Sequence, residues 1–266
     1  MTKAARMTRK APTSLKARAR KAAPNHDQRA IKQRSNAVQS KPPPPITKRG
    51  QATRERLKQA LSDLLQDNVF HDIRIEDITA RAGVRVSLFY HYFQSKIDIT
   101  NELLSELLET YRKDVSTRAK SSPLESIHYA NQRMAALYAA NPGAMRCLLE
   151  VHDTGAPFAS IWRKLTREWN ERIAHNIQRQ FPQAFANKQG YVSLAFALAG
   201  AADNLLYEYY VLKNPDLRAA HPEDEDVAKF LTTLWHRTLY LKNPPTDFMG
   251  KGLDGLAKLR AADEYP

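Results

Sequence analysis

The side chains best suited to acid–base or metal chemistry are Glu150, His152 and Asp153, in the stretch EVHD. A zinc-binding helix carries its second His one turn from the first, and here the eight histidines are scattered. A solvated helix end before the stretch TGAP explains the cluster better. Because no Ser-His-Asp, Walker or Rossmann pattern is present either, we expect no enzyme, no metal and no cofactor.

A second group of residues that could take part in recognition is the unbroken run of rings from Phe89 to Phe93, within RAGVRVSLFYHYFQSK. A strand would send alternate rings to opposite faces, and a helix would distribute them around its axis. At about 100° per residue, Phe89 and Phe93 share one helical face, and His91 lies on the other side. Some of these rings must therefore point away from the core.

The elements that would position these rings are two short helices, expected at 75–82 and 86–93. Gly83 lies between them, where the chain reverses and a positive φ suits glycine. Ile78 and Val84 can complete a small core around the inward rings. This arrangement is that of a helix-turn-helix.

The outward face of the second short helix would carry Ser87, Tyr90 and His91, with Arg85 before it and Lys96 after it. Such groups donate hydrogen bonds to phosphate oxygens and reach base edges in a major groove. The outward rings are therefore predicted to face DNA. The alternative is that the tyrosines lie at the rim of the same small core.

Helical spacing of apolar residues continues on both sides of this segment and predicts an all-α protein. Leu57, Leu61 and Leu65 lie on one face of a helix expected from Gln51, and a long helix is expected from about Lys96. Later helices are expected near 124–140, 143–153, 158–181, 187–213 and 223–242, about nine in total. No strand pattern or internal repeat is present, and the tail after Pro244 stays unassigned.

The charge of the chain is concentrated in residues 1–50. This segment holds 14 of the 41 Lys and Arg and only one acid, Asp27, of the 28 Asp and Glu, which accounts for the whole formal excess of +13. It ends in KPPPPITKRG, and consecutive prolines favour extended geometry. We therefore expect a disordered basic arm with a stiff linker.

The remaining composition excludes several classes of protein. Cys147 is the only cysteine, so no intrachain disulfide is possible and a reducing compartment is expected. The longest apolar run, 191–202, falls short of the ~20 residues that a membrane-spanning helix needs. The N-terminus lacks the apolar region of a secretory signal. We expect a cytoplasmic protein with no membrane partner.

Residues 51–100 resemble the DNA-binding domain of the tetracycline-repressor (TetR/AcrR) family of bacterial transcription regulators. The stretches TRERLKQALSDLL and IEDITARAGVRVSLFYHYFQSK carry the resemblance, and Ala82-Gly83-Val84, Phe89-Tyr90, Tyr92-Phe93 and Ser95-Lys96 lie at the family's motif spacing. The resemblance implies a homodimer whose helix-turn-helix binds a double-stranded DNA operator. It implies that the later helices form a small-molecule effector pocket and a dimer interface, and that the protein is nucleoid-associated when bound.

The resemblance also implies which residues contact DNA. By position these are Arg85, Val86, Ser87, Tyr90, His91, Tyr92 and Lys96. Of these, Tyr90 and Lys96 would hold phosphates, and Arg85 and His91 are candidates for base readout. Two positions depart from the family: Arg74 and Leu88 stand where Thr is usual or frequent. Leu88 can contact a thymine methyl but cannot donate a hydrogen bond, so the operator preference is expected to be unusual.

For the dimer interface we select two late segments. Small side chains on LAFALAGAADNLLYEYY would let another helix approach closely: Ala195, Ala199, Gly200 and Ala202. The last strong helix presents a second stripe: Val227, Phe230, Leu231, Leu234, Thr238 and Leu241. The alternative is that both stripes pack inside one protomer.

For the effector pocket we select large apolar and aromatic residues of the C-terminal half: Tyr129, Met134, Tyr138, Met145, Trp162, Trp169 and Phe196. Stripes of this kind also form ordinary core.

The expected organisation is therefore a basic arm and linker (1–50), a three-helix helix-turn-helix domain (51–97), a helical effector-binding and dimerisation domain joined to it by a long helix (98–244), and a tail (245–266). The predicted function is a ligand-responsive, sequence-specific regulator, a repressor released from a palindromic operator by a small molecule. The alternative is a nonspecific nucleic-acid-binding protein whose affinity comes from the basic arm.

Overall fold

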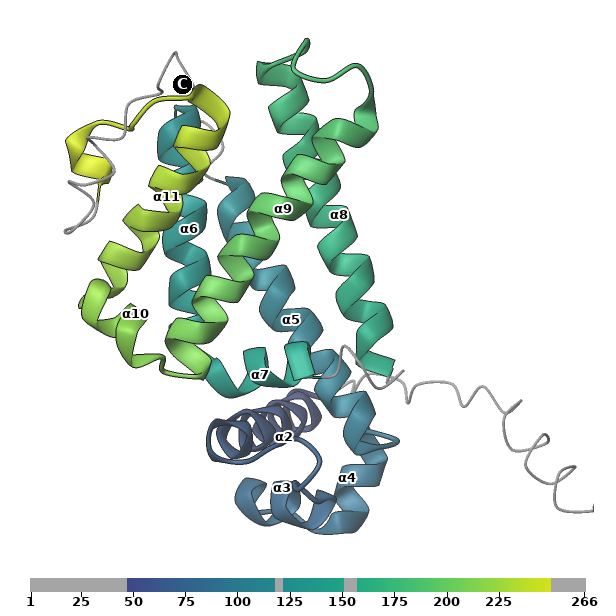
Figure 1. Ribbon diagram of the computed structural model, residues 1–266. Coiled ribbons are helices and arrows are strands. Elements are labelled where there is room, and N and C mark those ends of the chain that lie inside the picture. Colours follow the sequence, from purple (N-terminus) through teal and green to yellow (C-terminus); the bar gives the residue numbers. More distant parts are fainter. Residues whose placement is uncertain (1–46, 118–121, 151–156, 250–266) are drawn as a thin grey trace, which may run out of the picture. The chain divides into compact units, whose positions relative to one another are not determined.

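The computed structural model describes residues 47–117, 122–150 and 157–249, and these form ten α-helices and no strand (Figure 1). The all-α prediction is therefore confirmed. Residues 1–46 of the basic arm and linker predicted for 1–50, and most of the predicted tail, lie outside the described residues.

The first described helix, α2 (Lys48–Asp67), begins three residues before the predicted start. Its cap explains the start: the hydroxyl of Thr47 accepts a hydrogen bond from the Gly50 amide at 3.1 Å, which satisfies a free donor of the first turn. The end of the segment predicted as linker thus belongs to the helix. Helices α3 (Ile75–Ala82), α4 (Val86–Tyr92) and α5 (Lys96–Thr117) follow within one residue of their predicted bounds.

The later helices also follow the predicted segments closely. They are α6 (Pro123–Ala140), α7 (Pro142–Glu150), α8 (Pro157–Gln180), α9 (Lys188–Leu206) and α11 (Asp224–Tyr240). Helix α6 starts with a capping box, in which Ser122 and Glu125 bond reciprocally to each other's backbone amides. Proline at the first turn of several of these helices costs nothing, because the first-turn amides have no partner within the helix.

Two elements differ from the prediction. Helix α10 (Pro215–Ala220) was missed, because Pro215 was interpreted only as a breaker. It occupies the first turn instead, and the side chain of Asn214 caps that turn. The predicted helix 187–213 is also interrupted: α9 ends at Leu206, and a π-helix, η2 (Tyr207–Val211), follows. A short 3-10 turn, η3 (Thr246–Phe248), lies in the segment left unassigned.

The described helices pack in two main groups around their apolar stripes. One buried cluster runs from α2 through α3, α4 and α5 to α6, α7, η2 and α11, with Leu57, Phe89 and Tyr138 at its centre. A smaller cluster joins α8 and α9 through Ala174, Ile177, Tyr191 and Ala195. Within these groups α11 lies along α6 and α8 lies along α9 (Figure 1).

Candidate nucleic-acid interface

The turn between α3 and α4 has the geometry that the predicted helix-turn-helix requires. Gly83 has a φ of 65°, in the left-handed region. The Val84 amide donates to the Thr79 carbonyl at 2.9 Å and the Gly83 amide donates to Ala80 at 3.1 Å. These two bonds form a Schellman motif, which closes α3 and redirects the chain. Because a Cβ at Gly83 would meet no atom within 4 Å, the backbone angle alone selects glycine here.

At the other end of α3, the departure from the family pattern at Arg74 has a structural consequence. Arg74 precedes the helix and forms no side-chain cap. Asp77 compensates in part, since its carboxylate accepts a hydrogen bond from the Arg74 amide at 2.8 Å. The Arg74 side chain is exposed. The α3 helix therefore begins beside a cation.

The inward face of α4 is as predicted. Phe89 and Phe93 are fully buried and their ring centres lie 5.7 Å apart. Ile78 is fully buried in the same cluster and Val84 packs against it. These contacts fix which face of α4 remains outside.

The outward face of α4 carries five of the seven residues predicted to contact DNA. Arg85, Val86, Ser87, Tyr90 and His91 are all exposed, and Tyr90 is 55% exposed despite its large ring. None of these side chains is needed by the core. They form a surface of a cation, two hydroxyls and an imidazole, the groups that phosphate and base-edge recognition uses.

The structure places the other two predicted contacts differently. Tyr92 is only 8% exposed, and its ring belongs to the core. Lys96 donates to the carbonyls of Phe70 and Ile73 at 2.7 and 2.6 Å, and its ammonium lies 4.3 Å from the centre of the Phe70 ring. Burial lowers the pKa of Lys96. In this structure Lys96 closes the loop between α2 and α3, so its interaction with phosphate stays a prediction.

A buried arginine that the sequence analysis missed holds the C-terminal end of α4. Arg54 of α2 donates from Nε to Glu102 of α5 at 2.7 Å and from a terminal nitrogen to the Tyr92 carbonyl at 2.9 Å. Its guanidinium also lies 4.4 Å from the centre of the Phe93 ring. The hydrogen bonds that Arg54 donates to Glu102 are the main cause of the raised pKa of Arg54.

A signal for this network existed in the sequence. Arg54 and Lys58 lie on the same helical face as Leu57 and Leu61, where a cation requires a partner. Lys58 is buried and forms an ion pair with Glu55 at 2.8 Å, and it also pairs with Glu106 of α5. The ion pairs therefore tie α2 and the end of α4 to α5.

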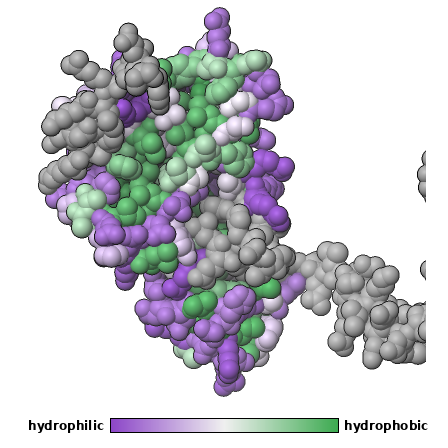
Figure 2. All heavy atoms as spheres, viewed as in Figure 1, coloured by the Kyte–Doolittle hydropathy of each residue, from purple (hydrophilic) through white to green (hydrophobic). Residues whose placement is uncertain are grey.

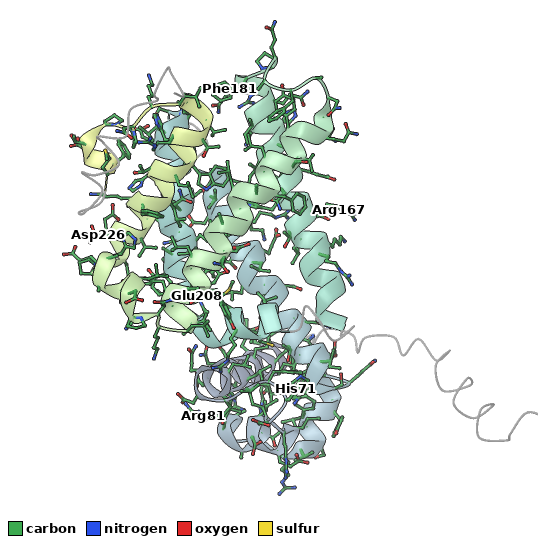
Figure 3. The ribbon with its side chains drawn as sticks, viewed as in Figure 1. His71, Arg81, Arg167, Phe181, Glu208 and Asp226 are labelled. Carbon is green, nitrogen blue, oxygen red and sulfur yellow. The ribbon has the colours of Figure 1, made fainter. Side chains whose placement is uncertain are left out.

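A second junction ties the end of α2 to α7. A Cβ at Gly143 would lie 1.9 Å from the Leu65 carbonyl oxygen, so only glycine permits this approach. Arg146 donates to the carbonyls of Leu65 and Asn68 at 2.9 and 2.8 Å, which satisfies carbonyls that a helix end leaves free. Figure 3 shows His71 in the segment that follows α2, and Arg81 on α3.

The residues predicted to form the dimer interface divide between the interior and the surface. Ala195, Ala202, Val227 and Leu231 are buried within one protomer, so this part of the prediction was wrong. Ala195 packs with Ala174 of α8, because small side chains allow close helix packing inside a chain as well as between chains.

The other members of the two stripes remain on the surface or partly exposed. Gly200 and Thr238 are exposed, Leu241 is 82% exposed, and Phe230 and Leu234 are half-buried. Phe230, Leu234 and Thr238 line a shallow hollow on α11. Figure 2 shows hydrophobic side chains gathered over α9 and towards α11 on the face turned to the reader.

The residues predicted to contact an effector do not form one set in this structure. Tyr138 and Met145 are fully buried in the larger core cluster, and Met134 and Trp169 pack against it. Tyr129 donates to Asp114 at 2.8 Å. Phe196 is 42% exposed on α9, which places it away from the interior. The Trp162 side chain lies outside the described residues, as do those of the EVHD cluster.

Within the described ranges, no group of three or more His, Cys, Asp or Glu side chains could hold a metal ion. In the same part of the chain, no helix combines the length and the apolar character needed to cross a bilayer.

A left-handed glycine turn, an inward pair of phenylalanines and an outward polar face on α4 define a helix-turn-helix DNA-binding protein. The profile of the family described as "Bacterial regulatory proteins, tetR family" matches residues 59–103, which span α3, α4 and parts of α2 and α5. In these residues the chain is similar to the DNA-binding domain of TetR-family transcriptional regulators.

Relatives extend the similarity beyond the matched domain. The HTH-type transcriptional regulator BetI of Klebsiella pneumoniae (strain 342) is 26% identical over 209 residues, covering 72% of this chain and 95% of that protein. A putative TetR-family regulator from Syntrophomonas wolfei has the same fold, with a TM-score of 0.58 at 20% identity over 71% of this chain and 95% of that one.

A third similar structure contains a bound ligand. The transcriptional regulator FadR from Bacillus subtilis, in complex with stearoyl-CoA, superposes with a TM-score of 0.51 at 16% identity, covering 67% of this chain and 97% of that chain. At this identity the likeness concerns the fold alone.

Proposed function

We propose that this chain is a homodimeric repressor that binds a near-palindromic operator through α4 and is released by a small molecule bound in its C-terminal half. The outward face of α4 carries the proposal. Arg85, Ser87, Tyr90 and His91 are exposed and unused by the core, and their chemistry suits phosphates and base edges. A dimer would present two such helices about one DNA turn apart, or close to it.

The test is an in-vitro selection of DNA sites at about 0.2 M salt, where nonspecific phosphate contacts are weakened. Full-length protein is compared with a chain beginning at Thr47, the residue that caps α2. We expect both proteins to enrich the same palindrome. Equal affinity of the wild type for the selected and random DNA would refute sequence-specific regulation.

Two variants assign roles on α4. His91→Ala should relax preference at one base position, because an imidazole can read a base edge. Tyr90→Phe should weaken binding to all sequences alike, because a phosphate contact carries no sequence information. Arg56→Ala, an exposed arginine of α2, is the matched control. A change of base preference in Tyr90→Phe would instead assign base readout to Tyr90.

The second candidate function, a nonspecific binder, is favoured by the concentration of charge in residues 1–50. It predicts that only the full-length chain retains DNA, with a steep salt dependence, and that neither protein enriches a sequence. The same selection therefore distinguishes the two functions. Repression is then tested by transcription from a promoter that contains the selected palindrome, where an activator would raise the signal.

The dimer would form through the partly apolar outer faces of α9 and α11. Phe196 on α9 and Phe230 and Leu234 on α11 retain accessible apolar surface, and Gly200 would allow close approach because no atom lies within 4 Å of its Cβ position. Such an exposed patch is typical of an interface.

Leu234→Glu would place a charge in that face, so we expect it to yield monomers in sedimentation analysis. Arg167→Glu changes the charge at an exposed position of α8, where the side chain points outward (Figure 3), and serves as the control. A Leu234→Glu protein that remains dimeric would exclude this face.

A further inference from the structure

The folded part of this chain carries no net charge, although DNA is strongly anionic. Residues 1–50 hold 14 of the 41 Lys and Arg and one of the 28 Asp and Glu, so 27 of each sign remain in residues 51–266. Cations that neutralise phosphates release counterions, and this release supplies most of the sequence-independent affinity for DNA. Surfaces that bind DNA are accordingly much more positive than other protein surfaces. Residues 51–266 as a whole do not meet this requirement.

The helix-turn-helix segment has few cations available for DNA. Residues 51–97 hold seven Lys and Arg, and four of them are engaged within the protein. Arg54 and Lys58 pair with acids of α5, and Lys96 donates to carbonyls of the loop before α3. Arg81 pairs with an aspartate of α2 at 3.3 Å. Three cations of this segment thus remain for an external anion.

Acids offset these three cations on the surface of the segment. The three are Arg56, Arg74 and Arg85, and all are exposed. Exposed acids of the same segment are more numerous: Glu55, Asp67, Asp72, Glu76 and Asp77. The face of α4 therefore offers groups that read bases, but the surface around it gives little general attraction to phosphates.

The first turn of α2 has the opposite character. Lys48 and Arg49 are both exposed there, and the turn contains no acid. The N-terminal end of a helix carries a partial positive charge, so cations at this end are unfavourable. An external anion would relieve this repulsion.

This turn lies close to the end of α4. Arg54, six residues after Lys48, donates to the Tyr92 carbonyl at 2.9 Å, and six residues of α-helix extend about 9 Å. Residues 1–46 are joined to α2 at Thr47 and are therefore tethered near the helix predicted to enter the operator. A tethered group has a high effective concentration for the adjoining part of a ligand.

The composition of residues 1–46 suits the phosphates of a duplex. They contain 12 Lys and Arg and one acid, Asp27. They contain no Phe, Trp or Tyr, and recognition of single-stranded nucleic acid depends on aromatic rings on which bases stack. The prolines at 42–45 favour an extended chain of about 3 Å per residue, which suits a contact beyond the DNA that α4 reaches.

We infer that residues 1–49 bind the duplex DNA that flanks the operator, through its phosphates and without reading its sequence. The two parts of the chain differ in role because their charges differ. Helix α4 selects the operator, and the N-terminal segment supplies the counterion release that residues 51–266 lack. That α4 selects an operator rests on the function proposed above, whereas the contact of residues 1–49 with duplex DNA does not.

The experiment measures the affinity of the full-length protein for the selected palindrome in duplexes of three lengths. They have no flank, about 10 or about 20 base pairs of flank on each side, and binding is measured between about 0.1 and 0.3 M salt. In the test variant, the 12 Lys and Arg of residues 1–46 are replaced by Gln. In the control variant, the order of residues 1–41 is scrambled, which keeps their charge.

For the wild type we expect flanking DNA to raise the affinity about tenfold or more and to steepen its dependence on salt, because each further phosphate contact adds about 0.9 to the slope. The Gln variant should bind all three duplexes alike and keep the base preference of the wild type, since it keeps α4. The scrambled variant should behave like the wild type, because a phosphate contact carries no sequence information.

The described end of the segment is tested separately. On flanked DNA, Lys48→Gln combined with Arg49→Gln should lower the salt slope by about two. Lys164→Gln combined with Arg167→Gln, two exposed positions on α8, is the matched control and should leave the slope unchanged.

The outcomes separate this inference from the proposed function. A wild type that ignores the flanks, or a Gln variant that responds to them as the wild type does, overturns the inference, while selection of a palindrome keeps the regulator. Single-stranded RNA that displaces the protein from flanked DNA better than random duplex at equal phosphate concentration also overturns it. If no palindrome is selected, the proposed function fails. Weaker binding of the Gln variant to random duplex then still supports the contact, and equal binding overturns it.

Discussion

Arg54 and Asp203 are both polar groups surrounded by protein, but their surroundings compensate the charge of Arg54 and not that of Asp203. Arg54 meets a carboxylate, a carbonyl and an aromatic face, so its charge is fully compensated. Asp203 has one hydrogen bond of 3.4 Å and no described cation. The first group joins helices together, whereas the carboxylate form of the second is costly in the folded state. A buried charge in this fold thus stabilises the packing of helices where it is paired and costs free energy where it is not.

The largest effect is expected from breaking the paired charge. Arg54→Met removes the guanidinium that donates two hydrogen bonds to Glu102, whose side chain is 11% exposed, and leaves Lys58 at 3.6 Å as its ion-pair partner. We expect a loss of about 3–5 kcal/mol in the free energy of unfolding, measured by urea denaturation at fixed protein concentration. Operator affinity should fall as well, because the end of α4 loses its support.

The matched control is Arg56→Met, an exposed arginine on the same helix, which should unfold like the wild type. Adding Glu102→Gln to Arg54→Met should recover part of the loss, since the carboxylate that lost its guanidinium then carries no charge. A loss below about 1 kcal/mol in the single variant would contradict a structural role for the pair.

Removing the unpaired charge of Asp203 should raise the free energy of unfolding, whereas removing Arg54 should lower it. The folded pKa of Asp203, about 7, lies above the ordinary value of roughly 3.9, so ionisation destabilises the folded state. This penalty begins as pH rises above the ordinary value and is complete above about pH 7. Asp203→Asn should therefore stabilise the protein by on the order of 2–4 kcal/mol at about pH 8, at roughly 1.4 kcal/mol per pKa unit.

The gain in Asp203→Asn should shrink steadily as the pH is lowered from about 7 to about 4. Thermal unfolding over this range measures it, and Asp216→Asn should show no such trend. A destabilising effect of Asp203→Asn at about pH 8 would mean that the carboxylate has a partner after all.

A smaller effect is expected at Lys96, a paired cation near the surface. Lys96→Met removes the donor for the carbonyls of Phe70 and Ile73, so we expect a loss of about 1–3 kcal/mol in stability. The family resemblance instead predicts weaker DNA binding at unchanged stability. Unfolding and operator binding measured on the same variant decide between the two roles.

The smallest effect on stability is expected at an exposed charge. Arg85→Ala should change the free energy of unfolding by no more than about 0.5 kcal/mol, because its side chain is exposed. It should nevertheless cost about 1–3 kcal/mol in operator binding if it reads a base. A loss of stability without any change in operator binding would mean that Arg85 stabilises the fold and does not contact DNA.

The helix-turn-helix could be predicted from the sequence because its determinants are local. Gly83 selects the turn through its own backbone angle, and Phe89 and Phe93 are one helical turn apart. The exposed face of α4 follows from that inward pair. Fold class and the surface of α4 therefore followed from the order of residues, and the positions of Tyr92 and Lys96 did not, because neighbouring helices cover them.

Local sequence patterns define most of the helices, the turn at Gly83 and the concentration of charge in residues 1–50. Tertiary structure alone brought Arg54 to Glu102 across 48 residues, and Asp203 to Tyr138 across 65. It also decided that Ala195 packs inside the protomer and that Gly143 lies against Leu65. Helical periodicity defines the face on which a side chain lies, but only the packing of distant helices determines what that face meets.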